Sequence, residues 1–294
     1  MLRVLPAPLR GAVAATILSF GTVVGVLAMV PPALLKLLLP FDAVRNACDR
    51  VLTGIASAWV ACNNAWIAAV NPGAHWDVQG VDGLHHRGWY LVSPNHQSWV
   101  DILVLQRVFH GRIPFLKFFL KQELIWVPVI GLAWWALDFP FMKRGRSAGA
   151  QMSDLATTRA ACEKFKRIPT TVINFVEGTR FTPAKHAAQR SPYRHLLKPK
   201  VGALAVALAT MGDQFEAMLD VTLVYPHGAP TFWDLLSGHL DAVVVRVQPR
   251  PIPGDLVAGD PQADRELRAR TAAWIERQWG EKDVLIDTAL AGSR

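Results

Sequence analysis

The sequence contains few cysteines and few charges, and both scarcities exclude classes of protein. Its three cysteines, Cys48, Cys62 and Cys162, stand alone without metal-ligand spacing, so neither a disulfide framework nor a zinc site is expected. Charged residues make up only 18%, against 51% hydrophobic residues and 11 Trp. That balance is too apolar for an ordinary soluble enzyme and too charged for a polytopic transporter. It favours a membrane-attached enzyme, and the isolated thiols indicate a reducing, cytosol-facing catalytic domain.

Positive charge is concentrated in the middle of the chain. Residues 143–200 carry 13 Lys and Arg against 3 Asp and Glu, an excess larger than the net charge of +8 for the whole protein. A basic block of this kind favours an anionic partner, such as an acidic lipid, a phosphorylated substrate or coenzyme A. Nucleic acid is not expected as a partner, because no nucleic-acid-binding motif accompanies the charge.

Charge is absent from 25 residues near the amino terminus, at 11–35. That length is sufficient to cross a bilayer, although a Pro-Pro pair is expected to end or kink the helix near one interface. A second uncharged stretch, 51–70, contains Thr, Ser and Asn, so we expect it to return beside the first helix or to lie in the interface. We therefore predict a membrane anchor of one or two apolar helices at 1–72 and a catalytic domain with a C-terminal helix at 73–294.

Short apolar runs alternate with helical patterns through the rest of the chain. Strands are predicted at 89–92, 114–118, 138–142, 171–175, 218–224 and 242–247. Helices are predicted at 99–109, 149–166, 201–211, 231–237 and 261–279, and an apolar run at 124–137 is predicted to be buried or interfacial. The alternation predicts an α/β fold with a largely parallel sheet flanked by helices, preceded by the hydrophobic, membrane-associated helical segment.

A histidine and an aspartate five residues apart, His96 and Asp101, are the strongest catalytic candidates. In one continuous helix that spacing would put them roughly 140° apart, on different faces. However, Pro94 disfavours helix just before them, and Ser98 is a good N-cap for a helix that starts at Trp99. Asp101 can then face a His96 imidazole that folds back over the helix start, and can fix its tautomer, so that the other ring nitrogen can take a proton from a substrate alcohol. The alternative is a structural His held by a helix-capping Asp.

A second motif, Glu177-Gly178-Thr179-Arg180, follows an apolar strand and is expected at its carboxyl end, where α/β sheets usually bind ligands. The glycine allows close backbone approach, the threonine offers a hydroxyl, and the arginine can hold a phosphate through two parallel hydrogen bonds. We expect an ionised Glu177 that orients Arg180 or a glycerol hydroxyl. The alternative is a tight turn with a surface ion pair.

A third motif, residues 141–144, ends in two cations, Lys143 and Arg144. If the sheet is parallel, this strand end delivers them to the same side of the domain as the other two motifs. The alternative is a solvated basic edge.

In this order and at these separations, the three motifs resemble those of the glycerolipid acyltransferase family that includes the 1-acylglycerol-3-phosphate acyltransferases. The family's motifs are Asn-His-x4-Asp, an aromatic-aliphatic-x-Arg ending and Phe-Pro-Glu-Gly-Thr-Arg. The continuations at 181–186, 197–200 and 220–225 are similar to the lysocardiolipin acyltransferase-like branch, and the resemblance covers about 90–226. Val176 stands where the family usually has proline. The usual Val-Pro-Val-like strand is also changed, so the acceptor need not be simple lysophosphatidic acid.

The resemblance implies roles for these residues. His96 would be the general base and Asp101 its orienting partner. The phosphorylated acceptor would be bound by a set of side chains and backbone groups from the other two motifs: Lys143, Arg144, Glu177, Gly178, Thr179 and Arg180. Backbone amides near the start of the helix at 99 are expected to stabilise the oxyanion.

The implied reaction moves a fatty acyl group from acyl-CoA or acyl carrier protein to the free hydroxyl of a lysophospholipid, most simply 1-acylglycerol-3-phosphate. No metal or bound cofactor is expected. The same chemistry on lysocardiolipin, another lysophospholipid or glycerol 3-phosphate stays open, and a lipid-binding or regulatory membrane protein without turnover is the alternative from another class. The implied location is a membrane, the inner membrane in a bacterium, with the catalytic domain facing the cytosol.

Overall fold

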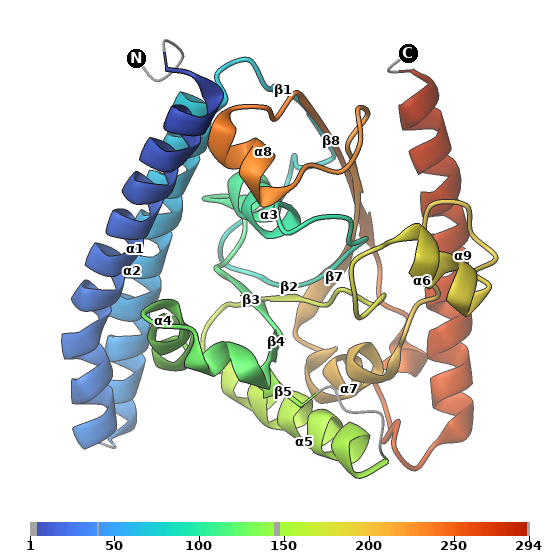
Figure 1. Ribbon diagram of the computed structural model, residues 1–294. Helices are drawn as coiled ribbons and strands as arrows, with labels where there is room; N and C mark the ends of the chain where they lie inside the picture. The colour runs from blue at the N-terminus through green and yellow to red at the C-terminus, as the bar shows by residue number, and fades with distance from the viewer. Residues whose placement is uncertain (1–4, 40, 144–147, 293–294) are drawn as a thin grey trace.

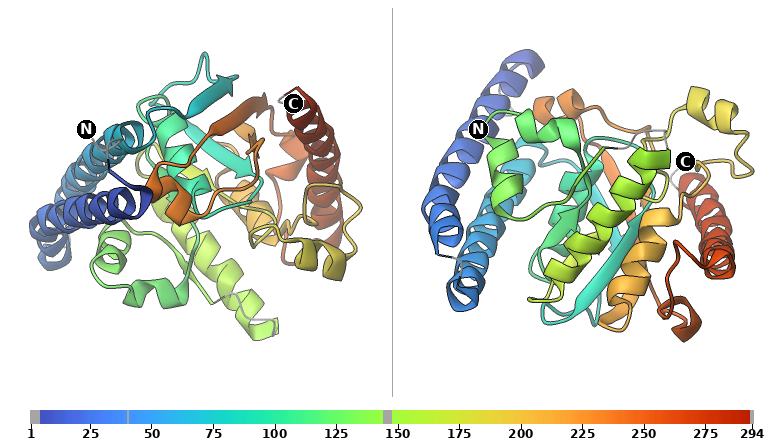
Figure 2. Two further views of the ribbon diagram at one scale, coloured as in Figure 1. Left: turned by 45° about the horizontal axis from the view of Figure 1, so that its top comes forward. Right: turned by 90° about the horizontal axis from the view of Figure 1, so that it is seen from below.

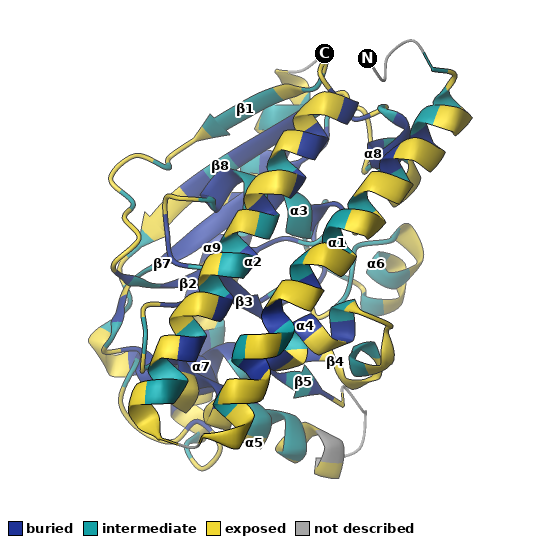
Figure 3. Ribbon diagram, turned by 90° about the vertical axis from the view of Figure 1, so that its left-hand side faces the viewer, coloured by how far each residue is buried: buried dark blue, intermediate teal, exposed yellow. Residues whose placement is uncertain are grey.

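A computed structural model describes residues 5–39, 41–143 and 148–292. Two long antiparallel helices, α1 (Ala7–Leu38) and α2 (Asp42–Val70), form a hairpin along one side of an α/β domain (Figure 1). Both are long and apolar enough to cross a membrane, judged by length and composition. The outer face of the hairpin is exposed along most of its length (Figure 3). This is the hydrophobic helical segment that the sequence predicts.

The domain is built on a mostly parallel sheet in the strand order β1-β8-β7-β2-β6-β3. Its strands are β1 (His75–Gln79), β2 (Trp89–Pro94), β3 (Leu116–Phe118), β6 (Thr171–Ile173), β7 (Phe215–Val224) and β8 (Ala242–Arg250). Strands β7, β2, β6 and β3 run in one direction, while β8 is antiparallel to β7 and parallel to β1. Strands β4 (Leu120–Lys121) and β5 (Phe141–Met142) pair in a small separate sheet.

Helices cover both faces of the sheet (Figure 2). They are α3 (Asp101–Phe109), α4 (Ile130–Ala136), α5 (Ala148–Phe165), α6 (Pro183–Gln189), α7 (Gly202–Met211), α8 (Phe232–Ser237) and α9 (Arg265–Ala291), with short 3-10 helices η2 (Gln122–Trp126) and η3 (Gly254–Leu256). Alternate side chains of β2 enter different cores: Tyr90 and Val92 pack with the hairpin, α3 and α8, whereas Leu91 packs with α5, α7 and α9. This alternation follows the two-residue period of a strand.

The hairpin is joined to the domain by polar contacts as well as by the shared core. The buried Asn71 side chain donates to the Leu235 carbonyl (2.9 Å) and accepts from Leu240 N–H (3.1 Å). Arg107 of α3 donates to the Asn64 carbonyl of α2 at 2.8 Å. These contacts fix the orientation of the hairpin relative to the sheet.

The predicted fold class is confirmed, but several details differ from the prediction. The predicted strand at 138–142 shortens to β5 and joins β4 rather than the main sheet. Of the two effects predicted for the Pro-Pro pair, an end of the helix is wrong, because α1 continues through Pro31 and Pro32 to Leu38 and packs against α2. Strand β1 is absent from the prediction, since its sequence is only partly buried.

Candidate active site

The His96 motif and the Glu177 motif leave the sheet side by side. Strands β2 and β6 are parallel neighbours, with Val92 opposite Ile173, so the loops that follow them emerge at one edge. Phe181 N–H donates to the His96 carbonyl at 2.7 Å and joins the two loops directly. Both motifs therefore lie at the carboxyl ends of parallel strands, as the sequence predicts for the second one.

His96 and Asp101 are in direct contact. Nδ1 of the imidazole lies 2.8 Å from Oδ2 of the carboxylate, and Asp101 is fully buried. The same carboxylate accepts from the N–H groups of Gln97 (2.7 Å) and Ser98 (2.9 Å). Since an ionised carboxylate only accepts, this network assigns the proton to Nδ1 and leaves Nε2 as the nitrogen able to accept a proton.

Tyr225, just after β7, completes the shell around Asp101. Its hydroxyl donates to Oδ1 of Asp101 at 2.7 Å. Burial, reinforced by the charge of Asp101, raises the pKa of this phenol well above its usual value, so the hydroxyl stays protonated and keeps donating. Sequence reasoning includes Tyr225 in a motif but gives it no role. The contact joins residues 124 positions apart, which no local pattern reveals.

The turn before α3 differs in part from the predicted cap. Helix α3 begins at Asp101 rather than Trp99. The Ser98 hydroxyl donates to the carbonyl of Pro230 and accepts from Val100 N–H at 3.0 Å, and this amide two residues further on is one of the two that an N-cap side chain usually accepts from. The reciprocal half of the capping pattern is present, because Ser98 N–H donates to Asp101.

This turn also restricts the choice of oxyanion donors. The amides of Gln97 and Ser98 donate to Asp101, that of Val100 donates to the Ser98 hydroxyl, and that of Asp101 points to the Ser98 carbonyl at 3.4 Å. Among the described contacts of these five residues, the Trp99 amide is the one without an acceptor. Within the turn at 97–101, Trp99 is therefore the amide left as a candidate oxyanion donor.

Two neighbours hold the imidazole in place. The Asn95 side chain continues the sheet by accepting from Leu223 N–H (2.7 Å) and donating to the Leu223 carbonyl (2.9 Å). The ring of Phe175 lies against the ring of His96, with centroids 4.2 Å apart at 31°. His96 is thus fixed by β7 on one side and by the loop after β6 on the other.

Glu177 has a different environment from the one predicted. It is fully buried, and its carboxylate accepts from His96 N–H (2.8 Å) and from Leu197 N–H (3.1 Å). Burial raises its pKa to about 7, against the opposing effect of these two hydrogen bonds and of the Lys282 charge. Its carboxylate thus joins two backbone segments, and among the described contacts none links it to Arg180, one of the two partners predicted for it. The other predicted partner, a glycerol hydroxyl, stays a prediction. The place of Glu177 in the acceptor site stays a prediction as well.

Gly178 and Thr179 lie where the loop turns back. Gly178 has φ of +68°, a left-handed conformation that glycine adopts without steric cost, and a Cβ there would touch the Lys200 side chain at 3.4 Å. The Thr179 hydroxyl accepts from Nζ of Lys185 at 2.7 Å, and the same ammonium donates to the Arg180 carbonyl at 3.0 Å. Two lysines that the prediction did not assign thus lie beside this motif.

Arg180 and Trp99 link the second motif to the first. The guanidinium carbon of Arg180 lies 4.3 Å from the centre of the Trp99 ring, a cation–π arrangement. Trp99 is 55% exposed, whereas the next two residues, Val100 and Asp101, are buried. A cation and an apolar surface therefore adjoin the His96–Asp101 pair.

The third motif is only partly described. Lys143 is exposed just after β5, and its N–H donates to Oδ1 of Asp154 in α5 at 2.7 Å. Among the described contacts, none joins it to His96 or to residues 177–180. Arg144 lies outside the described residues. The acceptor-binding roles of both remain predictions.

A buried lysine from α9 supports the strand ends beneath the site. Lys282 is fully buried, and its ammonium donates to the carbonyls of Ser93 in β2 (2.8 Å) and Val221 in β7 (2.7 Å). It also pairs with Asp220 at 2.8 Å. Burial lowers the pKa of Lys282, whereas the charges of Asp220 and Glu177 oppose the shift. The sequence offers no signal for this role, because Lys282 lies beyond the helix predicted at 261–279 and its partners are distant in the chain.

Comparison with known proteins agrees with this geometry. A family model described as Acyltransferase matches residues 75–227, which include the His96 loop, the Glu177 loop and Tyr225. The chain belongs to the Acyltransferase family. Family membership as predicted from the motifs is confirmed, while the lysocardiolipin acyltransferase-like branch stays a prediction.

Named relatives of this Acyltransferase family member come from plants and mammals. It is 28% identical over 217 residues to 1-acyl-sn-glycerol-3-phosphate acyltransferase 2 of Brassica oleracea, covering 68% of this chain and 51% of the relative. It is 27% identical over 212 residues to the delta enzyme of Mus musculus, covering 66% of this chain and 51% of that one. The chain thus spans about half the length of the curated relatives it matches.

A solved structure shares the fold. The chain matches the crystal structure of the 1-acyl-sn-glycerophosphate (LPA) acyltransferase PlsC from Thermotoga maritima with a TM-score of 0.54 and 18% identity. The match covers 94% of this chain and 97% of that chain, so it includes the helical hairpin as well as the sheet.

Proposed function

We propose that the protein transfers a fatty acyl group from acyl-CoA or acyl carrier protein to the free hydroxyl of a lysophospholipid, with 1-acylglycerol-3-phosphate as the first candidate acceptor. The observation that carries the proposal is the His96–Asp101 contact, which leaves Nε2 unprotonated beside a cationic loop. The names of the curated relatives support the acceptor class.

The chemistry follows from the assigned tautomer. Nε2 of His96 removes the proton of the acceptor hydroxyl as its oxygen attacks the thioester carbonyl, and Asp101 stabilises the imidazolium that forms. The tetrahedral intermediate then expels the thiolate by breaking its C–S bond, and the imidazolium returns the proton to sulfur. The Trp99 amide is the candidate donor to the oxyanion.

The cationic loop supplies a place for the acceptor phosphate. Arg180 has its carbonyl held by Lys185 and its guanidinium placed over Trp99. Arginine can bind a phosphate through two parallel hydrogen bonds, which orients the rest of the acceptor as well as attracting it. We assign Arg180 to the phosphate, with Thr179 and Lys185 positioning the loop.

The surroundings of the site favour delivery of substrate from a membrane. The Ser98 hydroxyl binds the Pro230 carbonyl next to α8, and α8 packs on α1. Exposed Trp99 and Trp233 lie on this connection, and exposed apolar side chains continue along α1. Amphipathic Trp side chains suit the headgroup region of a bilayer. We propose that the hairpin holds the site against a membrane, with the catalytic domain on the cytosolic side.

The test is an acyl-transfer assay on the full-length protein in membranes or detergent. A panel of lysophospholipids, including lysocardiolipin, is combined with acyl-CoA and acyl carrier protein donors of several chain lengths. Thiol release and lipid product are both measured. We expect acceptor-dependent thiol release with equal amounts of acylated lipid. His96→Ala that retains the activity of the unmodified protein would show the mechanism to be wrong.

A second variant separates binding from chemistry. Arg180→Ala is expected to raise KM for the phosphorylated acceptor more than it lowers kcat, because the base is intact. An unchanged KM would remove Arg180 from the phosphate site. Lysophospholipid binding without thiol release from any donor would instead favour a lipid-binding protein without turnover.

A further inference from the structure

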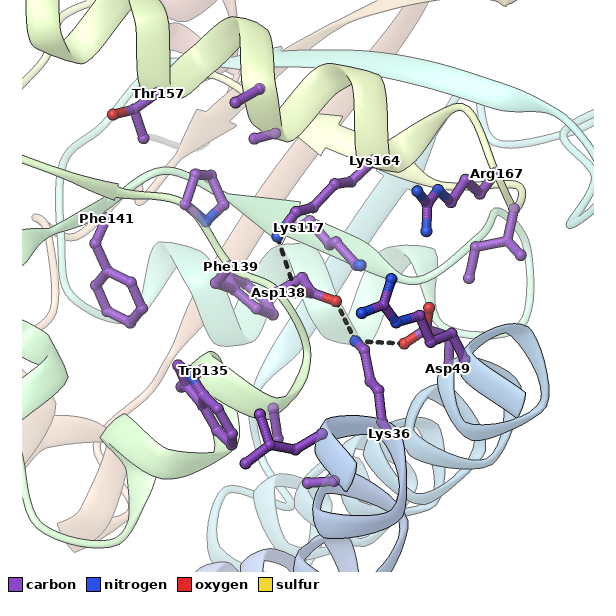
Figure 4. Close-up of a pocket in the computed structure, with 18 residues that line it drawn as sticks. Lys36, Asp49, Lys117, Trp135, Asp138, Phe139, Phe141, Thr157, Lys164 and Arg167 are labelled. Carbon is purple, nitrogen blue, oxygen red and sulfur yellow. Dashed lines mark hydrogen bonds and ion pairs between the residues drawn. The ribbon is translucent and has the colours of Figure 1, made fainter. Parts of the chain in front are cut away.

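A pocket of about 590 Å³ lies between the closed end of the hairpin and α5. Its lining comes from α1 and α2, from the segment that ends α4 and leads into β5, and from α5 (Figure 4). None of its lining residues is His96, Asp101 or a member of the 177–180 motif. It is therefore a separate cavity from the candidate active site.

The pocket is strongly cationic. Five basic side chains line it, against two carboxylates: Lys36, Arg45, Lys117, Lys164 and Arg167, with Asp49 and Asp138. Lys36 forms ion pairs with both carboxylates, at 2.6 Å from Asp49 and in contact with Asp138. Lys164 forms a further ion pair with Asp138 at 3.3 Å. Within the described part of the chain, no ion pair reaches the remaining three cations. The pocket thus has an uncompensated positive charge.

Lys117 is the most unusual of these cations. It comes from β3, is only 8% exposed, and has no hydrogen-bond acceptor among the described residues. Its ammonium lies 4.8 Å from the centre of the Phe165 ring. Burial lowers its pKa to about 8. A buried cation without a direct ion-pair partner is costly, and an anion entering the pocket would stabilise it.

Apart from the hydroxyl of Thr157, the uncharged side chains that line the pocket are apolar. Figure 4 shows Trp135 and Phe141 on one side of the cavity and Lys164 and Arg167 on another. Leu37 also lines the pocket, and beyond it the end of α1 exposes further leucines, with Leu38 at 73%. Cations next to a continuous apolar surface match a phosphate attached to acyl chains.

We propose that this pocket binds the phosphate of an anionic phospholipid, whose acyl chains lie along the exposed end of α1. The phosphate would contact Lys117, Lys164 and Arg167, and would tie α5 to the hairpin. The site is distinct from the acceptor site of the proposed reaction, and it does not depend on that reaction.

The test measures lipid retention by full-length protein in detergent. Phosphatidylglycerol and phosphatidylcholine of equal chain length are added, and bound lipid is measured by native mass spectrometry. We expect one retained phosphatidylglycerol and little phosphatidylcholine. Lys164→Gln combined with Arg167→Gln, both at exposed positions, should weaken phosphatidylglycerol binding at least tenfold. Lys117→Met should do the same, and Lys166→Gln, a neighbouring cation outside the pocket, should not.

Other outcomes would overturn the proposal. Equal retention by Lys166→Gln, Lys117→Met and the double variant would show that general surface charge binds the lipid. If Arg180→Ala abolishes retention while the pocket variants keep it, the lipid occupies the candidate active site instead. If inorganic phosphate or glycerol phosphate displaces phosphatidylglycerol at equal concentration, the pocket holds a free phosphate and the assignment to a lipid is wrong.

Discussion

The buried carboxylate of Asp101 accepts four hydrogen bonds, from His96, Gln97, Ser98 and Tyr225. A carboxylate with all these donors suits the role of orienting a base without itself taking a proton. Replacement by Asn would put an amide N–H where a carboxylate oxygen accepts from Nδ1, and would favour the wrong tautomer of His96. We expect Asp101→Asn to lower kcat by about a hundredfold or more, with KM for the acceptor little changed. Steady-state thiol release measures both values.

The matched control is Tyr225→Phe, which keeps the carboxylate and removes one of its donors. Loss of a hydrogen bond to a charged group is worth about 1.5 kcal/mol, so kcat should fall about tenfold. Asp101→Asn within threefold of the unmodified protein would contradict the assigned role of the carboxylate.

Glu177 makes stability depend on pH. Its pKa is about 7 in the fold against an ordinary 4.5, so the folded state binds more protons than the unfolded state between these values. The free energy of unfolding should therefore fall by about 3 kcal/mol as pH rises from about 4.5 to about 7. Chemical denaturation at several pH values measures this slope. Glu177→Gln should lose this part of the slope, and a variant that keeps it would assign the effect to other groups.

Local sequence patterns predict only part of the contacts between individual residues of the site. The Ser-x-x-Asp spacing indicates how His96 and Asp101 can meet, because capping is a local interaction. The clamp on Glu177 depends on Leu197 N–H, and the shell of Asp101 depends on Tyr225. Both partners reach the site through tertiary folding, so the spacing of residues in the motifs does not show them.

Among the elements, α9 has the clearest influence on the site. Lys282 holds the carbonyls of Ser93 and Val221, which adjoin the two strand ends around His96. Lys282→Met leaves the buried Asp220 without its nearest cation, and should destabilise the fold by about 3–5 kcal/mol. Denaturant unfolding measures this loss.

The double variant Lys282→Met with Asp220→Asn provides the control. Removal of both charges should recover part of the lost stability, because no buried charge is left unpaired. Activity should recover less than stability, since the two strand carbonyls still lack their donor. Equal losses in the single and double variants would show that Asp220 does not depend on Lys282.

The sequence predicts the elements best where a strand or helix pattern continues over many residues. The strand predicted at 218–224 is β7, Phe215–Val224, and the helix predicted at 261–279 is α9, which begins later, at Arg265, and continues to Ala291. The predicted strand at 138–142 fails because pairing with β4, rather than apolar content, decides its sheet. Tertiary folding decides which strands pair, and the composition of a single strand does not specify its partner.

At the scale of the whole molecule, the hairpin shares a hydrophobic core with the catalytic domain. Residues of α1 and α2 pack in the same hydrophobic cluster as β2, β7 and α3. Removal of 1–72 should therefore yield an aggregated chain rather than a soluble enzyme, as gel filtration and circular dichroism would show.

Asn71→Ala should lower the free energy of unfolding by about 2 kcal/mol, because it leaves two buried backbone groups without their hydrogen-bond partner.

The matched variant for the removal of 1–72 changes the outer face of α1. Phe20→Ser with Leu27→Ser alters side chains that are 70% and 64% exposed, so the fold should persist while partitioning into vesicles weakens. A soluble, folded and active chain without 1–72 would show instead that the boundary predicted at 72 separates two independent domains.

The position of Lys282 in α9 also bears on the order in which parts of the site form during synthesis and folding. Lys282 follows Ser93, the strand residue it holds, by 189 positions. During synthesis the hairpin and β2 leave the ribosome long before α9 does, and distant pairings form late in folding. The strand ends that carry His96 therefore gain their final support only when α9 docks. The helical hairpin is therefore complete in the growing chain before the strand ends around His96 have their support from α9.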